Sequence, residues 1–519
     1  GFEHNLQSLR VVDALEALHV QGILHKDIAL ANIVVTPADG VVRLIDFGIS
    51  ADTAFERTVT LGTLELEGTL ASLAPEQSGR LARDVDYRCD FYALGATLQA
   101  LLTGEPPFGH ISDPLQAVYA HLALAPHPLR ALCPEAPPVL ARLISRLLAK
   151  EPEHRYQSHH VLRRDLRAIR DGLRDPALLE QLVLAQGDLS EQFRLSGRLY
   201  GRTDEASRLH RAFEAAALGA ARLVTLGGVS GIGKTALVHD VQRSLLAHRG
   251  QMVGGKFDPL GLADLCAAFV QALAQRIEQV MAQPPLQQSA WRARLEALLG
   301  ANAGVAQAVL PALVDLLGRV VPVDPVPGPV ESENRFVRTM ELCFAGLASP
   351  QEPLVVFIDD LQWSDRLSRR LLRELVLDEG LRHLLFIVAY RSNEVLPDSP
   401  IARDLAALQV VGERHVALTV GPLAVRDVAQ WLGDSLQQPV SEVLDLAALC
   451  HTKTSGNPFF LVRFLLELHA RQHIWLDRAA PCWRWSIDHI HNEKVADNVA
   501  EFMLGELRGL PPATRHALV

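Results

Sequence analysis

Eight residues, Gly228–Thr235, have the types and the spacing that bind phosphate. They read Gly-Val-Ser-Gly-Ile-Gly-Lys-Thr and fit the pattern G-x-x-x-x-G-K-[ST]. Lys234 can reach the β- and γ-phosphates of a nucleotide, and the Thr235 hydroxyl can ligate Mg²⁺. The glycines that let successive N–H groups face an anion are Gly228, Gly231 and Gly233. The loop therefore predicts a site for ATP and Mg²⁺.

Two acidic side chains and one basic side chain follow apolar runs that are typical of buried strands. Asp359 and Asp360 end the run that begins at Leu354. Arg391 follows the run Leu384–Ala389. In parallel sheets such strand ends lie beside the bound ligand. We predict that Asp359 belongs to the Mg²⁺ shell and that Asp360 polarises the attacking water. Arg391 could sense the γ-phosphate, and an ordinary surface arginine is the alternative.

A second set of residues, between positions 25 and 155, could transfer a phosphoryl group. His25-Lys26-Asp27 with Asn32 fits the pattern H-R-D-x-x-x-x-N, with Lys in place of Arg, and Asp46-Phe47-Gly48 follows at a suitable distance. Asp27 would orient the substrate hydroxyl, while Asn32 and Asp46 would hold Mg²⁺ against the phosphates. The order continues with Ala74-Pro75-Glu76, Asp90 and Arg155.

The elements that must position these residues belong to two kinds of fold. Residues 1–175 combine helical periodicity with two short strands, Ile33–Thr36 and Val41–Ile45, joined by a turn. From residue 199, three apolar runs at 222–226, 354–358 and 384–389 alternate with helical stretches, which predicts a parallel sheet with crossover helices. After Pro422 the pattern reads as wholly helical. A tryptophan-rich segment around Cys482 could stack on a ligand, but a buried hairpin is favoured.

Composition sets further limits. The chain has 519 residues, which predicts about three domains, and 49% of them are hydrophobic, which is enough for folded cores. The net charge of −10 argues against nucleic acid as the main partner. The six cysteines form no C-x-x-C pair, so we expect neither disulfides nor zinc, and a cytoplasmic location. No apolar run is long enough to span a membrane.

The residues from 199 onward resemble the signal-transduction ATPases with numerous domains, a branch close to the AAA+ ATPases. The resemblance implies a helical lid in which Pro458 contacts the nucleotide, a winged helix that begins within Asn498–Leu518, and a slow nucleotide switch that could self-associate. It rests on the phosphate-binding loop, Tyr200-Gly201-Arg202, Asp359–Asp365, Tyr390-Arg391 and Ser455–Phe460.

The earlier motifs resemble the C-terminal lobe of a Ser/Thr protein kinase. This resemblance implies that Glu76 pairs with Arg155, that Asp90 braces the catalytic loop, and that Thr69 contacts Asp27. His25, Phe47 and Gly48 complete the structural motif. The activation segment also holds Thr58, Thr60 and Thr63, which could be phosphorylated, although solvated loop threonines are favoured.

A kinase-like lobe followed by such an ATPase is similar to the bacterial hybrid sensor kinases, in which GAF and histidine-kinase modules follow. Ser78–Asp90 and Gly255–Asp258 look typical of that group. We therefore expect an ATP-dependent signal-transduction protein that acts on an unknown protein substrate. No glycine-rich loop precedes the catalytic loop, so we expect the chain to be part of a longer protein whose kinase site is completed elsewhere.

Two positions depart from the kinase pattern. Ala29 stands where Ser/Thr kinases usually carry a Lys that steadies the γ-phosphate, and Lys26 replaces an Arg that binds phosphate with two hydrogen bonds. One alternative is therefore a pseudokinase scaffold whose ATPase binds nucleotide without turnover. Another is an ATPase-type transcription regulator that binds DNA through the winged helix.

The expected fold is multidomain. A mainly helical kinase-like C-terminal lobe covers residues 1–175, and a linker covers 176–197. An α/β P-loop ATPase core with a parallel sheet covers 198–420, a helical lid 421–494, and the start of a winged helix 495–519.

Overall fold

The computed structural model describes residues 5–36, 41–48, 50–52, 69–79, 84–111, 113–173, 175–190, 192–241, 245, 248–258, 265–323, 328–408, 412, 414–477 and 482–492. The chain divides into two compact units. One comprises Gly1–Asp188, Asp204–Gly227 and Thr235–Thr419, and the other comprises Leu189–Thr203, Gly228–Lys234 and Val420–Val519.

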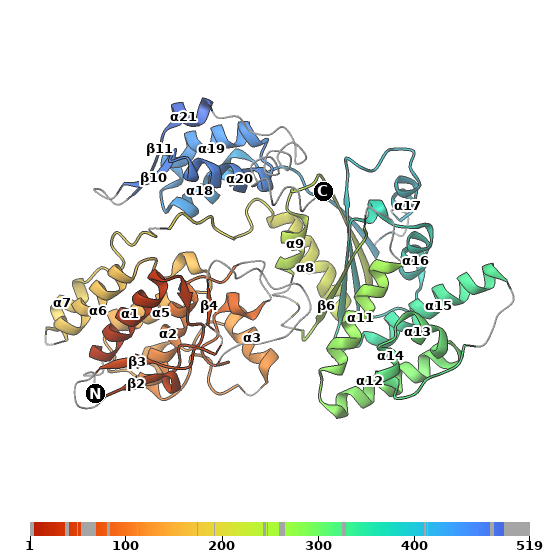
Figure 1. Ribbon diagram of the computed structural model, residues 1–519, viewed down its shortest axis with the longest axis horizontal. Helices are drawn as coiled ribbons and strands as arrows, with labels where there is room; N and C mark the ends of the chain where they lie inside the picture. The colour runs from red at the N-terminus through yellow and green to blue at the C-terminus, as the bar shows by residue number, and fades with distance from the viewer. Residues whose placement is uncertain are drawn as a thin grey trace, which may run out of the picture. The chain divides into compact units, whose positions relative to one another are not determined.

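The first region, residues 5–188, is mainly helical (Figure 1). Its helices are α1 (Asn5–Val20), α2 (Arg88–Thr103), α3 (Pro114–Ala123), α4 (Leu129–Leu132), α5 (Pro138–Leu147), α6 (His159–Gly172) and α7 (Pro176–Gln181), with 3₁₀ turns η2 (Leu30–Asn32), η3 (Pro75–Ser78) and η4 (Pro152–His154). Two antiparallel pairs join β1 (Ile23–Leu24) to β4 (Ala51–Asp52) and β2 (Ile33–Val35) to β3 (Val42–Leu44). The predicted hairpin is confirmed, and its turn lies outside the described residues.

Helix α2 forms the centre of this region, because its residues from Arg88 to Gln99 are all buried. Gly95 allows α5 to approach closely, since a Cβ at this position would lie 2.7 Å from Cβ of Leu147. Helix α6 begins after Ser158, whose hydroxyl accepts the N–H of Val161 and satisfies one donor of the first turn. The packed helices give the loops at the start of α2 a rigid support.

The second region, residues 204–419, is built on a five-stranded sheet. Its strands are β5 (Ala221–Gly228), β6 (Gln251–Lys256), β7 (Leu354–Asp359), β8 (Leu384–Arg391) and β9 (His415–Thr419). They lie in the order β6-β7-β8-β5-β9 and form a parallel sheet, as predicted. Strand β8 therefore lies between β5, which leads into the phosphate-binding loop, and β7, which ends in Asp359.

Helices cover this sheet, and α11 packs against β6 and β7 (Figure 1). The helices are α8 (Thr203–Ala217), α9 (Lys234–Asp240), α11 (Ala267–Met281), α12 (Pro285–Leu299), α13 (Ala303–Val309), α14 (Leu313–Leu317), α15 (Pro329–Leu347), α16 (Arg366–Leu377) and α17 (Pro400–Leu408), with turns η5 (Gly300–Asn302) and η6 (Leu361–Trp363). The three predicted strands are β5, β7 and β8. Strands β6 and β9 escaped prediction because both are edge strands without a continuous apolar run.

The lid region follows residue 420. It comprises α18 (Val425–Leu436), α19 (Val440–Thr454), α20 (Pro458–Ala470), β10 (Ile474–Asp477), β11 (Cys482–Trp485) and α21 (Ile487–Asn492). Strands β10 and β11 pair antiparallel, so the predicted hairpin is confirmed and the prediction of a wholly helical region is wrong there. The cause is the alternation of large apolar side chains, which buries Trp483 and Ile474 against the lid helices. The predicted winged helix lies outside the described residues.

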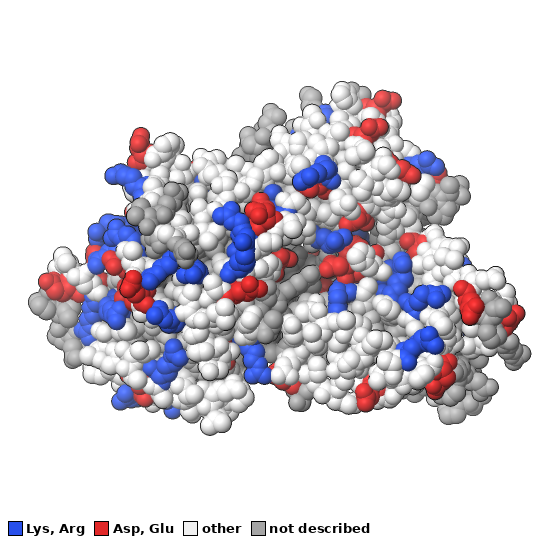
Figure 2. Space-filling view, turned by 180° about the vertical axis from the view of Figure 1, so that it is seen from behind, with Lys and Arg blue, Asp and Glu red and all other residues white. Residues whose placement is uncertain are grey.

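Basic and acidic side chains are interspersed over the face that Figure 2 shows. Along the described stretches, no helix is both long enough and apolar enough to cross a membrane.

The packing of α11 on β6 generates a test. A Cβ at Gly255 would lie 1.8 Å from the carbonyl oxygen of Ala268, so Gly255→Ala must displace backbone. We expect it to lower the free energy of unfolding by about 2–3 kcal/mol or more. The neighbouring Gly254→Ala is a matched control, because its Cβ would meet nothing nearer than the Phe357 oxygen at 3.7 Å. Urea unfolding of both variants measures the difference, and equal stabilities would contradict this account of the packing.

Candidate functional site

The first constellation centres on Asp27. Its Oδ1 accepts the backbone N–H of Thr69 at 2.8 Å, and its Oδ2 accepts Nδ2 of Asn32 at 2.9 Å. The Asn32 amide also donates to the Asp27 carbonyl oxygen at 3.0 Å. The predicted contact between Thr69 and Asp27 therefore exists, through the main chain. These hydrogen bonds hold both carboxylate oxygens of Asp27 in one orientation.

Asp90, at the start of α2, holds the backbone of the same loop. Its Oδ2 accepts the N–H of His25 at 2.9 Å, and its Oδ1 accepts the N–H of Lys26 at 2.8 Å. Nε2 of His19 lies 2.8 Å from Oδ2 of Asp90. Because Asp90 is fully buried on a packed helix, the predicted bracing of the loop is what the structure shows. It also fixes Lys26 in a left-handed conformation with φ 68°.

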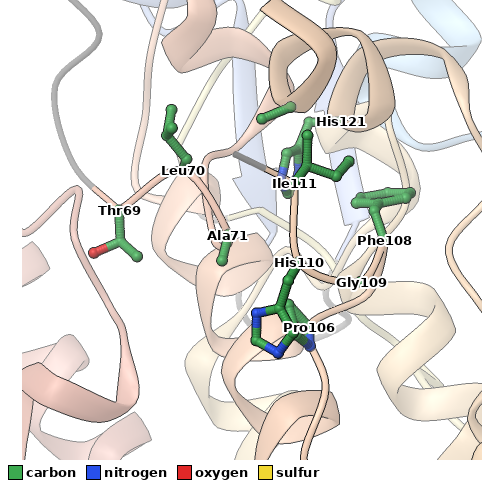
Figure 3. A pocket seen from close by; sticks show the side chains of 10 residues that line it. Thr69, Leu70, Ala71, Pro106, Phe108, Gly109, His110, Ile111 and His121 are labelled. Atoms are coloured by element: carbon green, nitrogen blue, oxygen red, sulfur yellow. The ribbon is translucent and has the colours of Figure 1, made fainter. Parts of the chain in front are cut away.

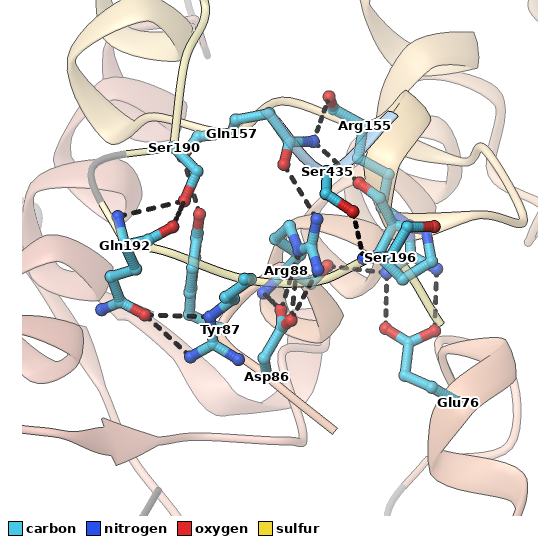
Figure 4. Close-up of polar contacts among 12 residues, drawn as sticks. Glu76, Asp86, Tyr87, Arg88, Arg155, Gln157, Ser190, Gln192, Ser196 and Ser435 are labelled. Carbon is cyan, nitrogen blue, oxygen red and sulfur yellow. Dashed lines mark hydrogen bonds and ion pairs between the residues drawn. The ribbon is translucent and has the colours of Figure 1, made fainter. Parts of the chain in front are cut away.

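A second buried contact in this region is the ion pair between Arg155 and Glu76. Arg155 donates to both carboxylate oxygens of Glu76, at 2.6 and 2.8 Å, and both side chains are buried (Figure 4). Arg155 also donates to the carbonyl oxygen of Arg88 at 2.8 Å, which ties the turn η3 to α2. Burial acts to lower the pKa of Arg155, but the adjacent Glu76 outweighs it and raises that pKa. The predicted pairing is therefore present and charged.

Asp46, Phe47 and Gly48 are exposed, and Asp46 has a left-handed φ of 64°. The Phe47 ring lies 4.8 Å from the His25 ring, so the segment stands beside the catalytic loop. The amide nitrogen of Asn32 donates its hydrogen bonds to Asp27, so the amide oxygen of Asn32 remains available to ligate a cation. Asn32 and Asp46 thus fit Mg²⁺, which takes oxygen ligands and keeps phosphate and water oxygens in its shell. Thr58, Thr60 and Thr63, for which the sequence favours solvated loop threonines over phosphorylation sites, lie outside the described residues.

An apolar pocket of about 420 Å³ lies beside Thr69 (Figure 3). The residues Thr69–Ala71 form one wall, and the loop Pro106–Ile111 faces them together with His121 from α3. Nδ1 of His121 lies 2.9 Å from the Tyr92 hydroxyl, and burial together with the charge of Lys150 lowers the pKa of His121 to about 3. The pocket wall therefore contains a neutral imidazole.

Lys150 supports the opposite side of this wall. Its Nζ donates to the carbonyl oxygens of Ala120 and His121, at 3.0 and 2.7 Å, and lies 4.4 Å from the centre of the Phe108 ring. Burial, followed by the charge of Arg155, lowers the pKa of Lys150 to about 7. The polar contacts of Lys150 lie behind the apolar lining of the pocket and hold its wall in place.

The phosphate-binding loop has the backbone that its glycines predict. Gly231 and Gly233 have φ of 75° and 96°, which other residues adopt only with strain. Nζ of Lys234 donates to the carbonyl oxygens of Gly228 and Val229, at 2.8 and 3.1 Å, so the ammonium group lies over the loop. Thr235 stands exposed in the first turn of α9. This arrangement fits the phosphates and Mg²⁺ of a nucleotide.

The lid contacts this loop directly. Nδ2 of Asn457 donates to the Ser230 carbonyl oxygen at 3.0 Å, and the N–H of Phe459 donates to that of Gly231 at 3.2 Å. A Cβ at Gly231 would lie 2.6 Å from Cβ of Phe459, so only glycine allows this approach. Pro458 lies between the two contacting residues as the first residue of α20. Its predicted contact with nucleotide stays a prediction.

The ends of β7 and β8 bring Asp360 and Arg391 together. Nε of Arg391 donates to Oδ1 of Asp360 at 3.0 Å, and Nζ of Lys256, at the end of β6, lies 3.2 Å from Oδ2. Gln362 donates to Oδ1 at 2.8 Å and accepts the N–H of Arg391 at 3.0 Å. Burial acts to raise the pKa of Asp360, but the hydrogen bonds from Gln362 and Lys256 and the charges of Arg391 and Lys256 hold it below its usual value.

Oδ1 of Asp359 accepts the backbone N–H of the next residue, Asp360, at 2.9 Å. Arg391 is part of a cluster and not an isolated surface arginine, and its guanidinium carbon lies 4.6 Å from the centre of the Trp363 ring. The roles predicted for Asp359, Asp360 and Arg391 in binding Mg²⁺, water and phosphate stay predictions.

Comparisons with known proteins identify the domains that contain these residues. Residues 4–166 match the family model of the protein kinase domain, and residues 198–387 match that of the AAA ATPase domain. A protein kinase domain is followed by an AAA ATPase domain. The kinase domain is 35% identical to a probable serine/threonine-protein kinase of Streptomyces coelicolor, over 32% of this chain and 24% of that protein. It is 37% identical to the serine/threonine-protein kinase PknB of Mycolicibacterium smegmatis, over 31% of this chain and 26% of that protein.

One relative matches both domains. The hybrid signal transduction histidine kinase G of Dictyostelium discoideum is 26% identical over 86% of this chain and 15% of that protein. The chain thus spans about a seventh of this distant relative and about a quarter of the two kinases.

The sequence did not reveal every residue of the ATPase domain's edge. Lys256 lies in the segment Gly255–Asp258 and Gln362 in Asp359–Asp365, and the sequence assigns neither of them a role of its own. Both act on Asp360 from other elements, and the only signal was that each lies in a short motif without an assigned role.

His121 in the kinase domain gives a pH-dependent prediction. Its pKa is lower in the folded state than the ordinary 6.5, so stability is complete above about pH 6.5 and falls as the pH falls toward 3. At about pH 5 the loss is about 2 kcal/mol. We expect His121→Asn, whose amide can meet the Tyr92 hydroxyl, to lose less stability than the unchanged protein between about pH 7.5 and pH 5. Denaturant unfolding at both pH values measures this, and an identical loss would contradict it.

Proposed function

We propose that this chain belongs to an ATP-dependent signal-transduction protein in which a Ser/Thr kinase domain is coupled to an ATPase that acts as a nucleotide switch. The observation that carries the proposal is the segment between the two domains. This segment is bound to the kinase domain at Asp188, and from residue 189 onward it is bound to the lid. The two attachment points are therefore nearly adjacent in sequence.

The first anchor is Asp188, which is bound into the kinase domain. Its carboxylate accepts the N–H groups of Gln157, at 3.0 and 3.1 Å, and of Ser158, at 3.0 Å, and Arg146 lies at 3.3 Å. The Asp188 side chain is 1% exposed. Residues 176–188 of the predicted linker therefore belong to the kinase domain, with whose core Leu179 and Leu184 pack.

The second anchor is the strap, defined here as residues 189–203, which is bound along the lid. Ser196 donates its N–H to Oγ of Ser435 at 3.0 Å (Figure 4). The Ser196 carbonyl oxygen accepts the Nε1–H of Trp431 at 2.9 Å. The Phe193 ring stacks on His469 at 4.5 Å. The Tyr200 hydroxyl donates to Asp434 at 2.7 Å, and the Ser190 N–H donates to Oε1 of Gln437 at 3.4 Å.

The strap also reaches the phosphate-binding loop through Arg202. This side chain donates to the carbonyl oxygens of Ile232, at 3.3 Å, and of Gly421, at 2.5 Å. With the contacts of Asn457 and Phe459, the lid and the strap both rest on the loop that would hold the phosphates. A change in the bound nucleotide would therefore act on the strap, provided that the lid binds differently to ATP and ADP.

The proposed kinase reaction is transfer of the γ-phosphoryl group of ATP, with Mg²⁺, to a protein hydroxyl. Asp27 would receive the hydroxyl, and the pocket beside Thr69 supports a peptide substrate with an apolar side chain near the acceptor. Ala29 is the residue that favours the alternative of a pseudokinase scaffold, because no ammonium group stands at that position.

Nucleotide binding by the loop can be measured on this chain. We expect saturable binding of ATP in the presence of Mg²⁺, and its loss in Lys234→Ala, because the ammonium group that meets the phosphates is removed. Calorimetric titration is the measurement, and Lys453→Ala, a lysine of the lid that donates to the His491 carbonyl oxygen, is the matched control. Equal binding by the Lys234 variant would contradict the proposal.

Coupling through the strap can be tested in the complete protein that contains this chain. We expect Lys234→Ala to change phosphotransfer by the kinase domain. Insertion of a flexible Gly-Ser segment between Asp188 and Leu189 should remove that change, because the connection gains free length.

Asp46→Asn is the control for phosphotransfer, which it should abolish. An Asp46 variant without effect would favour the pseudokinase scaffold. A response to Lys234→Ala that survives the insertion would show that the strap does not carry the coupling.

A further inference from the structure

Gln77 of the kinase domain lies in the turn η3, and its side chain contacts two different segments of that domain. Its Nε2 donates to the Lys26 carbonyl oxygen at 2.8 Å, and its Oε1 accepts the N–H of Ala74 at 3.0 Å. The Gln77 N–H also donates to the Ala74 carbonyl oxygen at 3.0 Å. One amide side chain therefore joins the catalytic loop to the segment that follows Thr69.

The contact with Lys26 is made where the catalytic loop needs support. Lys26 has a left-handed φ of 68°, which a residue with a Cβ adopts at a cost unless its surroundings hold it there. Oδ1 of Asp90 accepts the Lys26 N–H at 2.8 Å, and Gln77 donates to the Lys26 carbonyl oxygen. The peptide groups on both sides of Lys26 are thus held, and the second of them leads directly into Asp27.

The segment 69–77 also contacts Asp27 at its other end. The Thr69 N–H donates to Oδ1 of Asp27 at 2.8 Å, and the Ser72 N–H donates to the Thr69 carbonyl oxygen at 3.0 Å. The residues Thr69–Ala71 form one wall of the apolar pocket (Figure 3). The pocket wall and the catalytic loop are therefore joined twice, at Thr69 and at Gln77.

We propose that Gln77 is a positioning residue of the kinase domain, which sets the orientation of Asp27 relative to the pocket wall Thr69–Ala71. Its Nε2 acts on the catalytic loop and thereby on the rate of phosphotransfer. Its Oε1 acts on the wall and thereby on the binding of the peptide. The inference rests on the proposed kinase function.

Two variants separate the two hydrogen bonds, because an amide donates and accepts, a carboxylate only accepts and an ammonium group only donates. Gln77→Glu keeps an acceptor for the Ala74 N–H but places a negative charge against the Lys26 carbonyl oxygen. We expect kcat to fall about tenfold, with an unchanged KM for the peptide. Gln77→Lys keeps the donor to Lys26, so kcat should be retained while KM for the peptide rises about threefold.

The kinetic measurement uses the complete protein that contains this chain. The probe is a synthetic serine peptide with leucine on both sides of the serine, since the pocket beside Thr69 is apolar. Gln181→Glu is the matched control, because Gln181 is an exposed residue of α7, and this variant should leave kcat and KM unchanged.

Hydrogen exchange of this chain gives a readout that needs no phosphotransfer. In Gln77→Glu the Ala74 amide should keep its protection, while the Thr69 amide, whose acceptor is Asp27, should exchange faster. In Gln77→Lys the Ala74 amide should exchange faster and the Thr69 amide should keep its protection.

The proposal is overturned if Gln77→Glu leaves kcat unchanged, if it raises KM as strongly as it lowers kcat, or if both variants change the same amide. An unchanged complete protein that transfers no phosphate to the peptide would instead overturn the proposed kinase function, and the inference with it.

Discussion

The connection between the kinase domain and the lid has almost no free length, and the functional account depends on this constraint. Asp188 is held by the N–H groups of Gln157 and Ser158, and two residues later the N–H of Ser190 is bonded to Gln437. Two extended residues span roughly 7 Å. In the proposed function, the strap therefore acts on the kinase domain through this short connection.

The groups proposed to handle phosphate are oriented before any ligand arrives. Asp27 has both carboxylate oxygens held, and Asp90 binds two successive N–H groups of the catalytic loop. Asp360 is held by Gln362 and two cations. Asp90 and Asp360 are buried, and removing one partner from a buried charge is costly because that charge is then left without compensation. These side chains are therefore held in one orientation unless another ion replaces the partner that is lost.

The sequence predicted the features that depend on local pattern. The phosphate-binding loop, the continuous apolar strands β5, β7 and β8, and the ordered kinase motifs are all read within a few residues. The buried pair of Glu76 and Arg155 followed from resemblance, because no local pattern joins residues 79 apart. Strands β6 and β9 were missed because edge strands lack a continuous apolar run.

The sequence predicts a polar linker over residues 176–197, which includes the first part of the strap, for a related reason. The few apolar side chains of the strap, such as Phe193 and Tyr200, are too widely spaced to form a helix or strand pattern, and they gain their burial from helices more than 200 residues later. The ion pair of Lys256 with Asp360 escaped prediction because a contact across neighbouring strands depends on register, which no single segment encodes.

Hydrogen exchange along the strap with ATP or with ADP, each with Mg²⁺, tests the central claim most directly. The amides of Ser190 and Ser196 report the bonds to the lid, and those of Gln157 and Ser158 report the anchor at Asp188. The account predicts that protection of both sets differs between the two nucleotides. A change confined to the lid amides, such as that of Phe459, with the strap and the Asp188 anchor unchanged, would contradict it.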